Sequence, residues 1–230
     1  MISIFLPIKK TSKRLKNKNF LKIANFRNGL SEIKILQLLK FLRLLKKKKI
    51  SSEIIISTDS EKLLNKYDKN KNLKIFRRKK SLTRDDCLED LIKEVPKICF
   101  GKYILWTHAT SPIFCSKDYL DFVNFFFKQE KFKSAFSATT ISTFFMDANS
   151  NWLSHNYKKK KWPRTQDLKK FYFVNNAAFI SKRENYIISS DRLDSKPLPI
   201  ISRKYSDIDI DNKEDFVFFK KIFKNKSIPI

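Results

Sequence analysis

The stretch ISIFLPIKKTSKRLKNKN, residues 2–19, joins a short apolar run to a loop that is rich in cations. The first seven residues, ISIFLPI, carry no charge, and a run of this kind beside a polar loop is typical of a buried β-strand. The loop at 9–19 contains no acidic residue to balance its lysines and its arginine. Taken alone, it fits a solvated basic segment, a contact to nucleic acid or the floor of a phosphate-binding pocket.

Behind this loop, helical and strand patterns alternate along the chain. Residues 31–49 have apolar side chains at helical spacing, with Ser31 as the expected N-cap and a lysine run at the end where cations favour the helix dipole. Further strands are expected at 52–59, 72–78, 102–112 and 133–143, separated by helices at 60–69, 87–98 and 115–129. This order predicts an α/β fold, a three-layer Rossmann-like architecture with a mostly parallel central sheet.

Three polar segments follow predicted strands at one edge of that sheet. They are the opening loop, the STD of residues 57–59 and the HATSP of residues 108–112. Ligands of open α/β sheets bind outside the carboxyl ends of the strands. We therefore expect the binding site at this edge, with Asp59 ordering the neighbouring loop rather than binding a metal ion.

After residue 140 the alternation stops. Residues 142–182 mix short strands with polar turns, and we expect them to leave the sheet as an excursion. The chain then returns with DIDID, residues 207–211, as a strand that leads into a terminal helix. No repeat or long linker divides the sequence, so residues 1–230 are expected to form a single domain.

The charge is strongly positive. The formal net charge is +27, from 50 Lys and Arg against 23 Asp and Glu. Such an excess of positive charge is typical of proteins that bind nucleic acid. Here, however, the cations are spread along the whole chain, and the chain has only 2 Gly but 22 Phe. A compositional bias of the genome would produce this pattern. No RNA-recognition signature is present, so nucleic acid is not expected as a partner.

Cysteine usage and the N-terminus both favour a cytoplasmic protein. Cys87, Cys99 and Cys115 match neither a CxxC metal motif nor an even disulfide framework. The N-terminal MISIFLPIKK places its apolar residues before its charges, unlike a signal peptide. No apolar run reaches the ~20 residues of a membrane-spanning helix.

Three aspartates near the C-terminus carry a separate signal. Asp207, Asp209 and Asp211 alternate at the strand period, so a strand would project all three from one face. Like charges in such a row repel unless a cation compensates them, and Mg²⁺ prefers carboxylate oxygens together with substrate phosphates. The alternative is an edge strand with solvated acids.

Five stretches in order along the chain read LPIKKTSKRLKNKN (6–19), IIISTDSEKL (54–63), LWTHATSP (105–112), RTQDLKKFYFVNNAAFI (164–180) and DIDIDNKEDF (207–216). They are similar, in the same order, to IPARxGSKxxPxKN, VVSTDxEEI, LLQPTSP, RRQDLPxxYxENGAIYI and SIDIDTPEDL. The chain thus resembles the acylneuraminate cytidylyltransferases, the CMP-sialic acid synthetases and their relatives that act on other nonulosonic acids. The likeness spans nearly the whole sequence.

The resemblance implies a nucleotidyltransferase fold whose opening loop binds CTP. The residues implied to bind the nucleotide are Lys9, Ser12, Lys13, Lys18, Asn19 and His108. The loop departs from the family at Lys10 and Thr11, where relatives have Gly, and Gly admits positive φ and close approach to phosphate. Lysine side chains are then expected to supply the charge that a backbone cradle would otherwise supply.

The same resemblance implies the other site residues. Lys18, Asp209 and Asp211 would be catalytic, and Asp209 and Asp211 would hold Mg²⁺. His108, Arg164, Gln166 and Asn175 would bind an acidic 2-keto sugar. His108 has an alternative interpretation as a packed, satisfied core residue, and Arg164 has one as a tie between the excursion and the body. In relatives the excursion reaches a partner subunit, so the resemblance implies a homodimer in which 142–182 contributes to dimerisation and to the sugar site.

The reaction implied is the transfer of CMP from CTP to a sialic, legionaminic or pseudaminic type acid, with release of pyrophosphate. One alternative is an enzyme like the CMP-Kdo synthetases, which activate an eight-carbon acid. Another is a basic nucleic-acid-binding protein on a degenerate nucleotidyltransferase fold.

Overall fold

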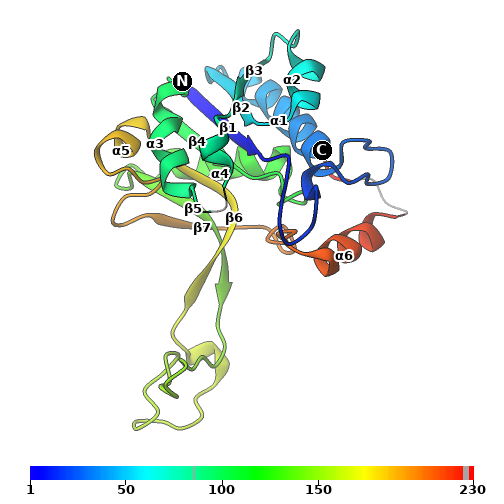
Figure 1. Ribbon diagram of the computed structural model, residues 1–230. Helices are drawn as coiled ribbons and strands as arrows, with labels where there is room; N and C mark the ends of the chain where they lie inside the picture. Colours follow the sequence, from blue (N-terminus) through cyan, green and yellow to red (C-terminus); the bar gives the residue numbers. More distant parts are fainter. Residues whose placement is uncertain (85, 225–227) are drawn as a thin grey trace.

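The computed structural model describes residues 1–84, 86–224 and 228–230, and its framework is a seven-stranded sheet with the order β3-β2-β1-β4-β6-β5-β7 (Figure 1). The strands are β1 (Ile2–Ile8), β2 (Ser52–Thr58), β3 (Leu73–Arg77), β4 (Tyr103–Thr107), β5 (Ser134–Ile141), β6 (Phe171–Lys182) and β7 (Leu198–Ile201). Strand β6 is antiparallel to its neighbours β4 and β5, and all other pairs are parallel. The predicted α/β fold with a mostly parallel sheet is confirmed.

Helices cover both faces of this sheet. They are α1 (Gly29–Lys47), α2 (Glu61–Tyr67), α3 (Leu88–Ile98), α4 (Ser116–Phe127), α5 (Arg183–Ile188) and α6 (Lys213–Phe223), with 3₁₀ turns η1 (Lys18–Phe20), η2 (Lys80–Thr83) and η3 (Thr165–Asp167). Helices α1 and α4 pack on one face, and α3 and α5 pack on the other.

Strand β1 shows why the opening apolar run forms a central strand. Ile4 and Leu6 point into the core beneath α1 and α4, whereas Phe5 points into the core beneath α3 and α5. All three side chains are fully buried. A strand with helices on both faces has no solvated side and therefore reads as a continuous apolar run rather than an alternating one.

Two local predictions were wrong. Helix α1 begins at Gly29, with Asn28 as its N-cap residue, so Ser31 lies inside the helix. Residues 207–211 form an extended loop instead of a strand, and the last strand of the sheet is β7, at 198–201. In this loop Ile210 N donates a hydrogen bond to Thr110 O at 2.8 Å, so a single backbone contact at this position replaces a strand ladder.

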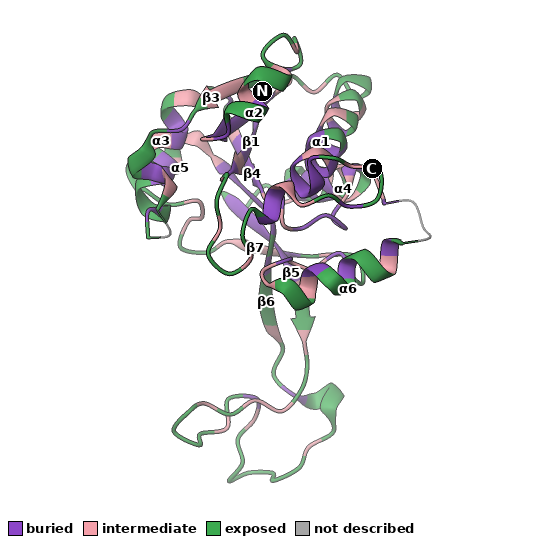
Figure 2. Cartoon of the chain, turned by 45° about the vertical axis from the view of Figure 1, so that its right-hand side comes forward, coloured by how far each residue is buried: buried purple, intermediate pink, exposed green. Residues whose placement is uncertain are grey.

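The excursion begins where β5 ends and returns in β6. Residues 142–170 leave the sheet, whereas the rest of the predicted segment, 171–182, forms β6, whose last residues pair with β4. The excursion extends away from the body and is largely exposed (Figures 1 and 2). Its end is held by stacked and edge-to-face contacts among the rings of Phe144, Trp152, His155, Tyr157 and Trp162.

Among the described residues, no helix is both long enough and apolar enough to cross a membrane.

Candidate functional site

The basic loop after β1 is folded back on itself by its own side chains. Ser12 Oγ donates a hydrogen bond to Leu15 O at 2.6 Å and accepts one from Lys18 N at 3.2 Å. Asn19 Nδ2 donates to Lys9 O at 2.9 Å. These contacts place Lys18 in a short 3₁₀ turn, with its side chain buried.

The loop takes its shape without glycine. Neither Lys10 nor Thr11 is among the described residues that have a positive φ, so neither position requires Gly. Lys10 N donates to Asp59 Oδ1 at 2.6 Å, which confirms that Asp59 orders the neighbouring loop. The backbone amide of Lys10 is therefore committed to a carboxylate, and positive charge at this loop comes from side chains.

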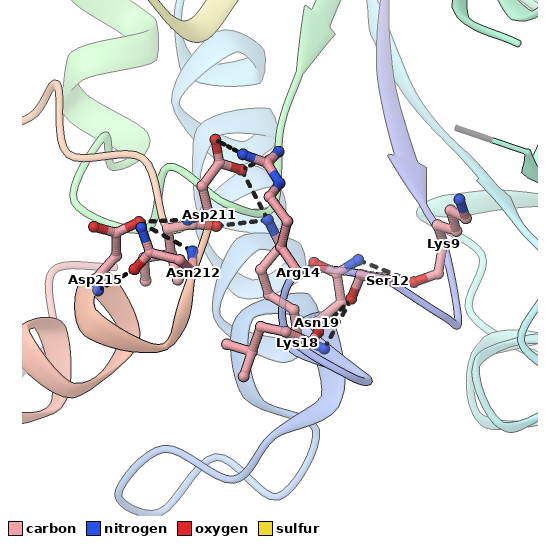
Figure 3. A network of polar contacts seen from close by, with 10 residues as sticks. Lys9, Ser12, Arg14, Lys18, Asn19, Asp211, Asn212 and Asp215 are labelled. Atoms are coloured by element: carbon pink, nitrogen blue, oxygen red, sulfur yellow. Dashed lines mark hydrogen bonds and ion pairs between the residues drawn. The ribbon is translucent and has the colours of Figure 1, made fainter. Parts of the chain in front are cut away.

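Two cations of the loop meet Asp211 of the C-terminal segment (Figure 3). Lys18 Nζ lies 3.0 Å from Asp211 Oδ1 and also donates to Ile210 O at 2.7 Å. Arg14 holds both carboxylate oxygens of Asp211, each at 2.9 Å. Burial raises the pKa of Asp211, but Lys18 and Arg14 outweigh it and leave that pKa below its ordinary value.

Asp209 has the opposite electrostatic character. Its pKa is raised by burial and by the like charge of Asp211, although hydrogen bonds from the side chains of Thr110 and Asn176 act against this rise. Its Oδ1 is buried and has no hydrogen-bond partner among the described residues. Asp207 faces elsewhere and accepts from Thr139 Oγ1 at 3.0 Å. The three aspartates therefore do not form one row, because their segment is a loop.

These segments border a cleft of about 470 Å³ at the carboxyl edge of the sheet. Its lining residues are Pro7, Lys9, Thr11, Ser12, Lys13, Arg14, Lys18, Asn19, Arg78, His108, Ala109, Thr110 and Asp211. A second hollow of about 570 Å³ shares the loop residues and extends to Thr83, Arg84 and Asp86. A cavity with this many cations fits a polyanion such as a polyphosphate.

His108 stands at the end of β4 and lines this cleft. Trp106 Nε1 donates to His108 Nε2 at 3.0 Å, and since an indole can only donate, His108 Nδ1 carries the proton and donates to Asn176 O. Burial, with the nearby charge of Arg192, lowers the pKa of His108 to about 3. The ring is thus neutral, with both nitrogens engaged by the protein, and it forms part of the cleft wall.

The residues predicted to bind the sugar are divided between two places. Arg164 lies in the excursion, where its guanidinium pairs with Asp167 at 2.9 Å, and Gln166 lies in the same 3₁₀ turn. Asn175 is buried in β6. Its side-chain Oδ1 accepts a hydrogen bond from Ser137 Oγ at 2.5 Å, and its Nδ2 donates one to Ser202 Oγ at 2.8 Å. None of the three is among the residues that line the cleft of the same chain, whereas His108 is.

Sequence reasoning missed two cations of the cleft. Arg14 was missed because it falls at a variable position of the matched motif, although its guanidinium pairs with both carboxylate oxygens of Asp211. Arg78 lies outside the five matched stretches, so no motif points to it. It is buried, and it donates to Ser57 O at 2.6 Å and to Ser57 Oγ at 3.2 Å. Its position directly after β3, at the same sheet edge, was the available signal.

A row of polar side chains on the buried face of α1 supports the cleft from below. Ser31 Oγ donates to Asn19 O at 2.7 Å. One turn on, Lys34 Nζ donates to Ser111 O at 2.9 Å, Phe114 O at 2.8 Å and Tyr119 Oη at 3.1 Å. After a further turn, Gln37 Nε2 donates to Pro112 O at 2.7 Å. The row Ser31, Lys34 and Gln37 ties the opening loop and the loop after β4 to one helix.

The chemistry of the donors fits a hard cation such as Mg²⁺. Asp209 offers an unpartnered buried oxygen, and Asp211, which interacts electrostatically with it, lines the cleft. Carboxylate oxygens from one or two side chains, completed by substrate phosphates, are the usual protein contribution to a magnesium site. No group of three or more His, Cys, Asp or Glu side chains suited to a metal ion occurs in the described part of the chain.

No family model and no curated protein matches this sequence. Solved structures do match. The 4-diphosphocytidyl-2C-methyl-D-erythritol synthase of Anaerococcus prevotii has a TM-score of 0.64 at 15% identity, over 97% of this chain and 98% of that one. A CMP:2-keto-3-deoxy-manno-octonic acid synthetase complexed with CTP has a TM-score of 0.62 at 11% identity over 97% and 98%. HddC of Yersinia pseudotuberculosis has a TM-score of 0.55 at 12% identity over 97% and 100%. At these identities the likeness shows a shared fold.

Proposed function

We propose that this chain is a CTP-dependent cytidylyltransferase that joins CMP to an acidic 2-keto sugar of the nonulosonic type. The observation that carries the proposal is the cleft in which Arg14 and Lys18 of the opening loop meet Asp211 of the C-terminal loop. Two solved structures of the same fold are named for cytidylyl products, and one of them is described as complexed with CTP. The five motifs that resemble acylneuraminate cytidylyltransferases narrow the acceptor to an acidic sugar.

In this reaction the anomeric hydroxyl oxygen of the sugar attacks the α-phosphorus of CTP. A new P–O bond forms, the bond between the α-phosphorus and its bridging oxygen breaks, and pyrophosphate leaves while the hydroxyl proton is released. Lys9, Lys13 and Lys18 hold and neutralise the triphosphate, since charge on the leaving pyrophosphate rises in the transition state. His108, neutral and fixed by Trp106 and Asn176, shapes the wall beside the acceptor.

Asp209 and Asp211 would hold the magnesium ion. When bound, Mg²⁺ supplies charge neutralisation at the phosphates and lowers the pKa of a coordinated hydroxyl. The residues of this chain prepare that position in different ways. Asp211 is kept ionised by Lys18 and Arg14, and Asp209 keeps a buried oxygen that no described residue satisfies.

The excursion suggests how Arg164 and Gln166 would take part. They lie in the excursion, away from the cleft of their own chain, and the stem beside them exposes the large side chains of Tyr172, Phe173 and Val174. We propose a homodimer in which each excursion reaches the cleft of the partner.

A mixture of Lys18→Met and Arg164→Ala chains, each inactive alone, should then recover about a quarter of wild-type activity, because half of the dimers are mixed and each mixed dimer has one intact site. If the mixture of the two variants stays inactive and light scattering gives the mass of a monomer, this arrangement is refuted.

Pyrophosphate release tests the reaction directly. The wild-type protein should release pyrophosphate with CTP, Mg²⁺ and one acid of a panel that includes N-acetylneuraminic acid and Kdo, and not with ATP, GTP or UTP. Asp209→Asn and Asp211→Asn should each abolish most of this turnover and weaken its Mg²⁺ dependence. Asp207→Asn is the matched control, because Asp207 bonds Thr139 outside the cleft lining. Unchanged turnover in both variants contradicts the proposed metal site.

The same assay separates the rival functions. Turnover of Kdo alone indicates an enzyme like the CMP-Kdo synthetases. No turnover with any triphosphate, together with binding of RNA or DNA that weakens steeply with salt, indicates a nucleic-acid-binding protein on an enzyme fold.

A further inference from the structure

Arg192 is a cation held against the sheet by aromatic rings. It lies in the segment between α5 and β7, and its guanidinium carbon stands 4.0 Å from the ring centroid of Phe179 and 5.1 Å from that of Trp106. Within the described part of the chain, the guanidinium makes no hydrogen bond and no ion pair. Asp191 acts on it only through its charge, without a hydrogen bond or an ion pair among the described residues. Burial lowers the pKa of Arg192, but a guanidinium group is so strongly basic that Arg192 remains a cation.

The two rings that hold Arg192 also hold His108. Trp106 donates its indole N–H to His108, and the rings of His108 and Phe179 meet edge to face at 6.0 Å. The charge of Arg192 is also one of the causes that lower the pKa of His108. His108 lines the cleft, and Arg192, although it is not itself among the lining residues, therefore lies near the part of the cleft wall at the end of β4.

This environment suits the recognition of a carboxylate. A guanidinium that lies over an aromatic ring contacts the ring with its flat face. The N–H donors around the edge of the guanidinium therefore stay available for hydrogen bonds. Partial removal from water strengthens its attraction to an anion, and a charge-assisted pair with a carboxylate provides two parallel hydrogen bonds. An exposed surface arginine has neither the fixed plane nor the low local dielectric.

The two arginines that line the cleft already have partners, and so does Arg164 of the excursion. Arg14 grips Asp211, Arg78 donates to Ser57, and Arg164 pairs with Asp167 in the excursion. Arg192 is the arginine near His108 whose donors are unused among the described residues.

We propose that Arg192 binds the carboxylate of the acceptor sugar beside His108 and thereby selects acidic over neutral acceptors. This inference rests on the proposed function, because it assigns a role at the acceptor end of that site. Arg164 and the rest of the excursion are then left to contact the remainder of the sugar.

The two histidines of the chain make a direct binding test possible. Full-length protein labelled with ¹⁵N-histidine is titrated with N-acetylneuraminic acid and with Kdo, each with and without CTP, and with the methyl ester of each acid. In the wild-type protein the ring resonances of His108 should shift saturably with at least one acid and not with its ester. His155, which lies in the excursion, serves as the internal reference.

The variants decide the role of Arg192. Arg192→Met keeps an apolar side chain on the two rings and should raise the dissociation constant of the acid about 10- to 100-fold, the range expected for one charge-assisted pair. The apparent KM for CTP should stay unchanged. Arg192→Lys should recover only part of the affinity, since an ammonium cannot form the planar pair. Lys196→Met, which removes an exposed cation from the same segment, should bind like the wild type.

Two results would overturn the proposal. If Arg192→Met binds the acid as the wild type does, while CTP-dependent turnover continues, the proposed function stands and Arg192 has only a packing role. If no acid shifts His108 in the wild type, and CMP is transferred only to a neutral acceptor, both the acidic acceptor and the role of Arg192 are refuted.

Discussion

Lys18 Nζ lies 3.0 Å from Asp211 Oδ1, although 193 positions separate the two residues in the sequence. The pair joins the loop after the first strand to the loop before the last helix, and Arg14 reinforces it. Because Lys18 is almost fully buried, this contact holds one end of the cleft together and is not an ion pair on the protein surface.

Replacing Lys18 by Met should lower kcat/KM for CTP about 30- to 1000-fold, as expected when a buried cation that faces a polyphosphate is lost. Asp211 would retain Arg14, so the fold should survive. Lys16→Met removes an exposed lysine of the same loop and should leave the kinetics unchanged. A double-mutant cycle with Asp211→Asn measures the coupling, and strictly additive losses would show that the pair does not act as a unit.

His108 should make stability depend on acid pH. Its pKa is about 3 in the folded protein, against about 6.5 for an unperturbed imidazole, so the unfolded chain takes up a proton first as pH falls. The free energy of unfolding should therefore fall by roughly 1.4 kcal/mol per pH unit below about 6.5 from this group. Urea titrations between pH 4 and 7 should show a shallower slope in His108→Gln. Identical slopes in the wild type and in His108→Gln would contradict the depressed pKa.

Lys34 should make the free energy of unfolding depend on pH in the alkaline range. Burial lowers its pKa from 10.5 to about 7, opposed by Cys115, Asp118 and Asp209. Between these two values the unfolded chain holds a proton that the folded protein lacks, so stability should rise with pH by roughly 1.4 kcal/mol per unit from this group. Urea unfolding from pH 7 to 9.5 checks this rise. Lys34→Met should be less stable overall, because Ser111 O and Phe114 O lose their donor, and its difference from the wild type should grow as pH rises.

Gly29 should not tolerate a side chain. Its φ is +52°, and a Cβ there would stand 2.1 Å from Leu21 O, so Gly29→Ala should cost more than about 2 kcal/mol of unfolding free energy. Ala24, at φ 48°, offers the reverse substitution, and Ala24→Gly should be neutral or stabilising by up to about 1 kcal/mol. Thermal denaturation of both variants tests this, and a melting temperature of Gly29→Ala equal to that of the wild type would contradict the strained geometry.

The order of elements could be predicted because each strand and helix carries its own pattern. The run 2–8 carries no charge and is apolar except at Ser3, since β1 has a helical layer on both faces. The loop at 207–211 was mistaken for a strand because alternation of Ile and Asp is equally compatible with an extended loop that buries Ile210 and turns its acids toward different partners. Spacing reports the period of a segment but not whether a neighbouring strand is there to pair with it.

The polar contacts of the site were harder to predict. Lys34 looks like one more lysine in a lysine-rich helix, and its burial depends on carbonyl groups that lie about 80 positions away. Arg192 matches no motif, and its place follows from the packing of two rings on different strands. Both residues are defined by long-range geometry, which a single sequence does not display.

The row Ser31, Lys34 and Gln37 has a consequence for how a ligand would bind. The opening loop and the loop after β4 are fastened to the same rigid helix, so the two sides of the cleft are already in place before any ligand arrives. A preorganised cleft loses little conformational entropy on binding, and affinity then depends mainly on charge and shape. A ligand that enters this cleft would therefore not have to move the opening loop and the loop after β4 relative to each other.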